Sequence, residues 1–568
     1  MRRIVLVTLL LSSLAGCQSG SQQTAAAPTA AATPHQREQR LITATISDPK
    51  TFNSLIAVDA SSGNATGPLF DGLVRLNPET TEQEPSLAER WEYNGDGTVC
   101  TFHLRHGVRW HDGQPFTAAD VAFTFDAIYD DRVPNSLKHV LLVDGQRIKV
   151  EVIDDYAVRL ILPRPFAPLI NSLGFEILPR HILGQSLKDG TFVRQWGIDT
   201  PPEKLIGTGP YRMARYVQAQ FIEYQRNPDY WMKDEKGAPL PYLESQTVLI
   251  VPNQDTMYLK FLSGQTDVHS PRPEEVADLR AKADQLKIAV QDIGLDTGSL
   301  FVSFNRNPRH YEKEGQTDPR LTWFSDLHFL RAIAHAVDKQ SMIVNCLSGY
   351  GKPAVAETSP ENKLFYNPNL TDYNYDLDEA RRLLKEGGYV EHDGVLQDAE
   401  GNPIEFSLTT NAGNQVREKI CSILKEDWTK LGMKVNYRPF DFPTLVEKLD
   451  SSYDWDAVLI GFTGGLEPNN GANLLRSSGN LHFWNPEQPE PATPWEAEID
   501  RLLEQGSREL DVQKRRQFYW RIQETLHDEL PMIQTVRQTT FAAYKTILQN
   551  YRPMVWGLYR PELIRLTD

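Results

Sequence analysis

Strand and helix signals alternate along most of this chain, and that alternation limits the folds open to it. Residues 99–104 have the apolar alternation of a strand, entered through the turn Asn94-Gly95-Asp96-Gly97. Thr117 predicts a helix N-cap, with Asp120 as the carboxylate of its first turn. Strands followed by helices in this way predict an α/β fold with a mostly parallel sheet covered by helices.

Three further helices and two strands are predicted in the second half of the chain. One helix starts near Asp326, and a second starts at the capping-box sequence 376–379 and stops at Gly387. The longest regular apolar period covers 414–431 and ends at Gly432. Strands are predicted at 435–438 and 457–460.

Length and charge set the number of lobes and exclude one class of partner. A chain of 568 residues is too long for one hydrophobic core, because cores stop growing near about 250–300 residues. Two or three lobes are therefore expected. With 59 Lys and Arg against 75 Asp and Glu, the net charge is −16. Such a chain lacks the positive charge that neutralises phosphates, so we expect no nucleic-acid partner.

The first 40 residues predict export and attachment to a membrane. Arg2 and Arg3 precede a short apolar stretch that ends in Leu14-Ala15-Gly16-Cys17, which is typical of a secretory signal. The last four residues resemble the bacterial lipobox, in which Cys17 would be acylated and become the first mature residue. Residues 1–17 are thus predicted as a lipoprotein signal peptide. Residues 18–40, rich in Ser, Gln, Thr, Ala and Pro, are predicted as a flexible tether.

Three cysteines remain in the body of the chain, namely Cys100, Cys346 and Cys421. So few cysteines do not form a disulfide framework. Either one bridge forms and leaves a free thiol, or all three are buried and unpaired. Their apolar neighbours favour the second alternative.

The motif search predicts no catalysis, no cofactor and no metal. His103, His106 and His111 suggest a metal site, but strand residues three apart point to opposite faces. Gly207-Thr208-Gly209-Pro210-Tyr211 lacks the full dinucleotide-loop pattern and predicts a tight turn before a strand. The glycines at 394 and 401 predict two turns of a hairpin rather than a calcium loop.

Several segments, in order, resemble the solute-binding proteins of peptide and nickel ABC importers, known as extracytoplasmic solute-binding family 5 or cluster C. The matching segments are LFDGLV at 69–74, PSLAERW at 85–91, FHLRHGVRWHDGQPFTAADV at 102–121, GTGPY at 207–211, FVSFN at 301–305 and RAIAHAVDK at 331–339. The resemblance extends from about Leu41 to the C-terminus. It implies the two-lobed type II periplasmic-binding-protein fold, also called a Venus flytrap, with an additional third domain.

The resemblance also implies domain boundaries. Lobe I would comprise 41–70, 206–298 and 535–568, the extra domain 71–205, and lobe II 299–534. The two ligand-facing lobes would close around a solute by hinge motion.

The ligand-facing residues are inferred by the same resemblance. Ser47 and Asp48 match the first ligand-facing segment, and Phe462, Thr463, Gly464, Gly465 and Glu467 lie in the second. Phe462 matches a stacking aromatic. Gly465 stands where the family's peptide binders usually carry an Asp that pairs with the ligand α-ammonium. Glu467 would replace that Asp if the loop brings it in; the alternative is a solvated Glu467 in a glycine-rich turn.

Two more candidates lie between a strand and the helix at 414–431. Asn411 matches a family position, and it lies where α/β sheets present ligands, at the carboxyl end of a strand. Arg417, in the first helical turn, would pair with a ligand carboxylate; the alternative is an exposed helix-face arginine.

Three classes of function remain open. The first is a monomeric receptor that captures peptides or similar small solutes for the permease and ATPase subunits of an ABC importer. The second is a receptor of the same fold for a non-peptide ligand such as a metal chelate, heme or an oligosaccharide. The third is an extracytoplasmic enzyme or sensor, which no motif supports. We expect a protein that is not an enzyme, located outside the cytoplasm and anchored through Cys17.

Overall fold

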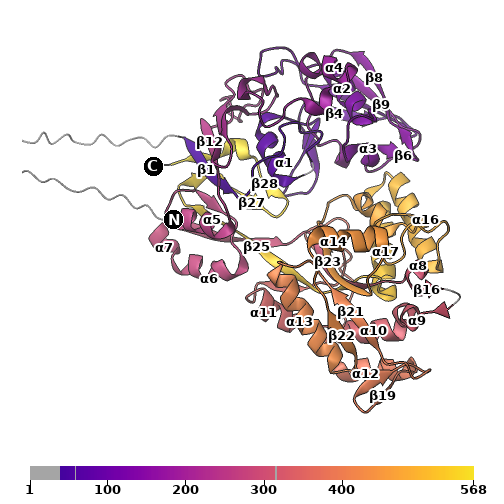
Figure 1. The fold of residues 1–568 in the computed structure, drawn as a ribbon. Coiled ribbons are helices and arrows are strands. Elements are labelled where there is room, and N and C mark those ends of the chain that lie inside the picture. The colour runs from indigo at the N-terminus through magenta and orange to yellow at the C-terminus, as the bar shows by residue number, and fades with distance from the viewer. Residues whose placement is uncertain (1–38, 58, 314–315, 568) are drawn as a thin grey trace, which may run out of the picture. The chain divides into compact units, whose positions relative to one another are not determined.

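The computed structural model of the chain describes residues 39–57, 59–313 and 316–567, and four main sheets organise them (Figure 1). The signal peptide, Cys17 and nearly all of the predicted tether lie outside the described residues. Among the residues that are described, no helix has the length and apolar character needed to cross a bilayer.

The first sheet joins the start of the chain to residues near 250. Its strand order is β1 (Arg40–Thr45), β12 (Ser245–Ile250), β11 (Phe221–Arg226) and β10 (Tyr211–Val217). β1 runs parallel to β12, whereas the other pairs are antiparallel.

The second sheet is entirely antiparallel. Its order is β4 (Ala88–Tyr93), β5 (Val99–Leu104), β9 (Ala157–Ile161) and β8 (Lys149–Asp154). Helix α2 (Ala118–Tyr129) packs on β8 and β9, and α4 (Arg180–Lys188) packs on α2. The predicted N-cap is confirmed: the Thr117 backbone N–H donates to Asp120 Oδ2 at 2.9 Å.

The third sheet contains β13 (Val268–His269), β25 (Val536–Lys545) and β14 (Ile288–Leu295), with β18 (Gly351–Pro353) also paired to β25. Helices α5 (Gln254–Leu262) and α6 (Pro273–Ala281) pack beside it. The chain leaves this sheet through residues 296–298 and returns through Thr535.

The fourth sheet has five strands, in the order β22 (Lys434–Tyr437), β21 (Glu405–Thr409), β23 (Ala457–Phe462), β15 (Ser299–Phe304) and β24 (Ile533–Gln534). β21 is parallel to β22 and β23, and β15 is antiparallel to its neighbours. Helix α13 (Gln415–Thr429) packs along β21 and β22 (Figure 1). The other helices of this region include α10 (Leu327–His335), α11 (Lys339–Cys346), α12 (Leu377–Glu386), the short α14 (Phe442–Glu447), α16 (Pro494–Arg508) and α17 (Val512–Glu529).

Short elements complete the fold. They are α1 (Ala60–Thr66), β2 (Val74–Leu76), β3 (Gln83–Pro85), α3 (Leu137–Val140), β6 (Leu142–Val143), β7 (Gln146–Arg147), α7 (Ala283–Leu286), α8 (Pro308–Tyr311), β16 (Glu312–Lys313), β17 (Gln316–Thr317), α9 (Pro319–Ser325), β19 (Val390–His392), β20 (Val395–Gln397), α15 (Ala472–Leu475), β26 (Leu548–Gln549), β27 (Pro553–Met554), β28 (Gly557–Leu558) and β29 (Arg565–Leu566). β19 and β20 confirm the predicted hairpin.

Several apolar cores form, as the length of the chain predicts. One core gathers the first two sheets together with Leu548, Ile564 and Leu566 from the C-terminal end. Two others lie on the fourth sheet and its helices, and a small one lies under α6.

The prediction of a mostly parallel sheet is wrong. Among the described strands of the four sheets, only β1 with β12 and β21 with β22 and β23 pair in parallel. Several neighbouring strands, such as β4 with β5 and β10 with β11, are consecutive in the chain and joined by short connections, which require antiparallel pairing. Helix-then-strand order indicates parallel strands only in the stretch 405–462.

Two local predictions need small changes. Helix α12 ends at Glu386, and Gly388, not Gly387, takes the left-handed conformation, with φ of 87°. Helix α13 ends at Thr429, and Gly432 has φ of 80°.

The cysteine prediction is confirmed, since Cys100, Cys346 and Cys421 are buried and unpaired.

The predicted turn at 207–211 is also confirmed, and its glycines have a steric cause. A Cβ atom on Gly207 would lie 1.7 Å from the Leu69 carbonyl oxygen, and one on Gly209 would lie 2.5 Å from the Leu69 carbonyl carbon. His111 closes the turn: Nδ1 accepts from the Gly207 N–H and Nε2 donates to the Gly209 carbonyl, both at 3.1 Å. Burial lowers the pKa of His111 to about 4.

Candidate functional site

Arg417 and Asn411 lie together at the carboxyl end of β21. Asn414 caps α13 by accepting from the Arg417 backbone N–H at 3.0 Å, which places Arg417 in the first helical turn. Arg417 Nη1 donates to Asn411 Oδ1 at 2.7 Å. The alternative of an exposed helix-face arginine is wrong, because the side chain is half-buried and burial lowers its pKa. No acidic side chain among the described residues forms an ion pair with it.

Phe462 lies at the end of β23, on the strand next to β15. The residue pairs with Ser299, and its ring stacks on Phe301 with centroids 6.0 Å apart and packs at a tilt against Phe483 with centroids 6.1 Å apart. Phe301 is fully buried and Phe462 half-buried. The ring is therefore partly core and partly available to a ligand.

The glycines after Phe462 have different surroundings. A Cβ on Gly464 would lie 1.8 Å from the Thr297 carbonyl oxygen, so only glycine fits there. A Cβ on Gly465 would meet no atom within 4 Å. Thr463, Gly464 and Gly465 are all exposed, and Asn362 Nδ2 donates to the Gly465 carbonyl at 3.3 Å. A side chain at 465 would thus have free space.

Glu467 is not solvated, and that alternative is wrong. The residue is 3% exposed, and the Arg515 guanidinium binds its carboxylate through both oxygens, with 2.9 Å from Nη1 to Oε2. Asn171 Nδ2 donates to Oε2 at 3.1 Å and the Asn469 N–H to Oε1 at 3.0 Å. Burial lowers the pKa of Arg515, but the Glu467 carboxylate outweighs this effect and holds that pKa above its usual value. Sequence reasoning missed Arg515, because α17 lies far along the chain from Glu467.

Ser47 and Asp48 lie just after β1. Asp48 Oδ1 accepts from the Tyr216 hydroxyl at 2.8 Å and from the Ala219 N–H at 3.0 Å, while Ser47 is exposed. Ile46 lines a cavity of about 290 Å³ with His269 and residues of α5 and α6. No described hydrogen bond joins Ser47 or Asp48 to the residues after β21 and β23.

Arg537, which the sequence did not single out, ties together the two chain passages between the third and fourth sheets. Its guanidinium donates to the carbonyl groups of Gly298, Ala356 and Glu357, with 2.7 and 2.6 Å to the last two. The first passage also bonds to β25, through the Asp296 N–H and the Gln538 carbonyl at 2.8 Å. Burial lowers the pKa of Arg537 to about 10.

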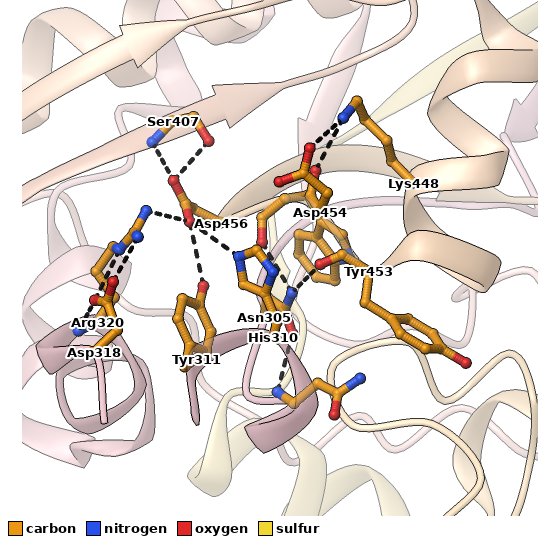
Figure 2. Close-up of polar contacts among 12 residues, drawn as sticks. Asn305, His310, Tyr311, Asp318, Arg320, Ser407, Lys448, Tyr453, Asp454 and Asp456 are labelled. Carbon is orange, nitrogen blue, oxygen red and sulfur yellow. Dashed lines mark hydrogen bonds and ion pairs between the residues drawn. The ribbon is translucent and has the colours of Figure 1, made fainter. Parts of the chain in front are cut away.

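A second polar cluster surrounds Asp456 at the other end of β23 (Figure 2). Asp456 Oδ2 accepts from the Ser407 N–H at 2.8 Å and its hydroxyl at 2.7 Å, while Oδ1 accepts from Arg320 Nη1 at 2.8 Å. The Tyr311 hydroxyl donates to Oδ1 at 3.3 Å, and Asp318 holds the rest of the Arg320 fork. The cluster borders a cavity of about 500 Å³.

The Asp456 cluster is a structural tie rather than a set of free functional groups. Burial raises the pKa of Asp456. Hydrogen bonds from His310 and Ser407 and the charge of Arg320 outweigh burial and lower this pKa to about 2. Every oxygen of the carboxylate has donors, so the group fixes Tyr311, Arg320 and Ser407 to the start of β23.

No metal site is assembled from the part of the chain that the structure describes. His103 Nε2 lies 3.2 Å from Glu92, His106 stacks on Tyr156, and His111 serves the turn at 207–209. The three histidines of the motif therefore have separate roles.

Comparison with known proteins identifies the class. The model of the bacterial extracellular solute-binding proteins, family 5, matches residues 82–483. The chain belongs to this family, and its fold is the mixed α/β, two-lobed fold of those binding proteins.

Similar curated proteins carry several ligand descriptions. A probable ABC transporter-binding protein of Deinococcus radiodurans is 28% identical over 92% of this chain and 91% of its own length. The dipeptide-binding protein of Escherichia coli is 27% identical over 89% of each chain. Heme-binding protein A of Haemophilus influenzae is 27% identical over 96% of this chain and 95% of its own.

Solved structures share the fold. AppA of Bacillus subtilis, in complex with a nonapeptide, has a TM-score of 0.70 at 24% identity and covers 93% of this chain and 99% of its own. NikA of Brucella suis, in complex with Fe(III)-EDTA, has a TM-score of 0.76 at 23% identity and covers 93% of this chain and 100% of its own.

Proposed function

We propose that this protein is the extracytoplasmic substrate-binding lipoprotein of an ABC importer. It captures a peptide or a similar small solute between two lobes by hinge closure and delivers the solute unchanged to a membrane permease. The protein acts as a monomer and catalyses no reaction. Family membership and the peptide-binding descriptions of several relatives support this role.

The observation that carries the proposal is the state of Arg417. Its half-buried guanidinium lies at the carboxyl end of β21 beside Asn411 and has no acidic partner among the described residues. Leaving a guanidinium partly desolvated without a counter-charge is costly. A ligand carboxylate would supply that charge through a bidentate contact.

The proposed division into lobes places the ligand residues on facing parts. Lobe I comprises 41–70, 206–298 and 535–568, the extra domain 71–205 and lobe II 299–534. Ser47 and Asp48 then belong to lobe I, and the residues after β21 and β23 belong to lobe II. The passages tied by Arg537 form the hinge.

The proposed location follows from the N-terminal residues. Cys17 would be acylated and would become the first mature residue once residues 1–16 are removed, and several acyl chains hold a protein durably on a membrane. Because Arg40 of β1 pairs with Ser245 and Gln39 bonds to Leu566, the predicted end of the tether at residue 40 is wrong, and the proposed tether comprises residues 18–38. It would let the body reach the permease from the outer side of that membrane.

The role of Gly465 gives the sharpest test of ligand chemistry. Peptide binders of this family pair the ligand α-ammonium with an Asp at this position, and Glu467 is committed to Arg515. The protein should therefore bind a peptide with a free carboxylate whether or not its amino terminus is acetylated. Calorimetry with matched free and N-acetylated di- to pentapeptides measures this.

A gain-of-function variant sharpens the same test. Gly465→Asp fits without steric conflict and should make the protein prefer the free amino terminus by about tenfold, because a desolvated charge-assisted bond is worth about 1.5–3 kcal/mol. Gly465→Asn is the uncharged control and should show no such preference. Failure of every peptide to bind the wild-type protein would contradict the peptide proposal.

A non-peptide ligand is the second candidate, and the missing carboxylate at Gly465 favours it. A heme-binding relative and a neighbour holding an iron chelate belong to the same set of similar proteins. Titration with heme and with a nickel–histidine chelate, beside the peptides, separates the two candidates. A rise in melting temperature with only the chelate or heme would favour the second, since a bound ligand stabilises the folded state.

A further inference from the structure

A cavity of about 840 Å³ lies away from the candidate ligand-binding residues in the sequence. Three separate stretches line it, one near Arg75 and Arg105, one at 231–242 and one at 550–563. The residues that line it include none of the proposed ligand-binding residues. Its most prominent side chains are Arg75, Arg105, Trp231, Lys233, Lys236 and Arg560.

Most acidic groups at this cavity already have partners. Glu562 accepts from Arg75 Nη1 at 3.0 Å, and Glu84 lies 3.5 Å from Arg75 Nε and accepts from Asn77 at 2.6 Å. Asp234 accepts from the Tyr242 hydroxyl at 2.6 Å and from two backbone N–H groups. Arg75 is thus paired with two carboxylates, and Glu235 is the acid of the lining that has no described hydrogen bond or ion pair.

None of the other cations of the lining forms a direct ion pair among the described residues, although the charge of Lys236 acts on Asp234. Arg105 Nε donates to the Ser86 carbonyl at 2.6 Å, which leaves its terminal nitrogens for other acceptors. Arg560 Nε is buried and has no hydrogen-bond partner. Lys233 and Lys236 are exposed at the same cavity. The lining therefore holds five cations, namely Arg75, Arg105, Lys233, Lys236 and Arg560, against the three carboxylates Glu84, Asp234 and Glu235. A positive excess remains even when Glu562, which bonds to Arg75, is included, in a chain whose net charge is −16.

The ring of Trp231 is fixed beside these cations. Its indole N–H donates to Asp71 Oδ2 at 3.1 Å, and the Arg105 guanidinium lies 4.7 Å above the ring centroid. The Tyr230 and Thr208 hydroxyls also donate to Asp71, so both oxygens of this carboxylate already accept hydrogen bonds within the protein. Trp231 and Leu240 then offer an apolar wall next to the positive charges.

We propose that this cavity is a second binding site, which takes the phosphate group of a small organic phosphate. A phosphate carries about −1.5 to −2 charges and three acceptor oxygens, so it matches two guanidinium forks and two ammonium groups better than a single carboxylate does. The rest of the molecule packs on Trp231. The phosphate group comes either from a soluble ester or from a phospholipid headgroup, and the test separates these sources.

Calorimetry of the purified full chain with glycerol 3-phosphate, inorganic phosphate and glycerol tests the site. We expect saturable binding of glycerol 3-phosphate, weaker binding of inorganic phosphate and none of glycerol. Arg560→Gln should weaken binding at least tenfold. Lys233→Gln with Lys236→Gln should weaken it several-fold, and these exposed lysines can be changed without loss of folding.

A matched control removes the same charge elsewhere. Lys149→Gln with Lys188→Gln deletes two exposed lysines that do not line the cavity, and binding should stay unchanged. Arg417→Gln should also leave it unchanged. Equal weakening in the Lys149 and Lys188 control, or loss of binding in Arg417→Gln, would overturn the proposal.

Sedimentation with phosphatidylglycerol vesicles tests the second source, with phosphatidylcholine vesicles as reference. Binding to phosphatidylglycerol alone that Lys233→Gln with Lys236→Gln reduces would support the site and identify a lipid headgroup. Binding of neither glycerol 3-phosphate nor these vesicles would refute it.

Discussion

At the scale of single residues, the buried carboxylates of this protein differ most from what their positions in the sequence suggest. Asp456 lies just before β23, and Glu467 lies in the loop after it. Each carboxylate pairs with an arginine that lies far away in the chain. Removing one partner of such a pair is costly, because the other charge stays buried.

Asp456→Asn should lower the free energy of unfolding by about 2 kcal/mol at pH 7, from a folded-state pKa of about 2 against an ordinary value of 3.8. The lowered pKa means that the contribution is present above about pH 4 and lost as the pH falls toward 2. Urea unfolding of both proteins at pH 7 and pH 2.5 measures this. Asp454→Asn is the control, since Asp454 is exposed and should change stability little.

Phe462→Ala should weaken ligand binding and also cost about 2 kcal/mol of stability, because half of the ring packs on Phe301 and Phe483. Phe442→Ala, which removes a 55% exposed ring from α14, should change neither. Thermal unfolding and ligand titration report the two effects separately. Unchanged binding in Phe462→Ala would remove this ring from the site.

At the scale of elements, the sequence predicted the positions of helices, because these depend on residues that lie close together in the chain. Caps and apolar periods gave α2, α12 and α13 to within a few residues, because capping and side-chain periodicity act over one or two turns. Strand orientation was missed, since it depends on how distant segments meet. The partners of Glu467 and Asp456 were missed for the same reason.

The turn at 207–209 provides the prediction at this scale. Gly207→Ala should destabilise the protein by more than about 3 kcal/mol or prevent folding, because its Cβ would overlap the Leu69 carbonyl. Gly63→Ala, in the middle of α1 with no atom within 4 Å of a new Cβ, should instead add about 0.5–1 kcal/mol. Chemical denaturation of both variants checks the pair, and equal effects would contradict the steric argument.

At the scale of the whole molecule, the sequence resemblance predicted the family and the fold, and the comparisons confirm both. The sequence did not indicate how the third and fourth sheets are joined. Arg537 has no recognisable motif, and its role depends on carbonyl groups from two separate segments, one at Gly298 and one at Ala356 and Glu357.

Cys17→Ser should release the protein from the membrane fraction into the soluble fraction, because the acyl anchor would be lost. Cell fractionation followed by immunodetection measures the distribution. The variant that still sediments with membranes would contradict the lipoprotein proposal. Leu14→Ala, which weakens the lipobox but keeps Cys17, is a useful intermediate.

The three buried thiols have a practical consequence for measuring motion. Burial raises the pKa of Cys100 to about 12, and it raises the pKa of Cys346 and Cys421 as well, so very little reactive thiolate exists near neutral pH. Spectroscopic probes attached to newly introduced surface cysteines would therefore label those positions selectively. Pairs of such probes would let distances within the working molecule be followed in solution without first replacing Cys100, Cys346 or Cys421.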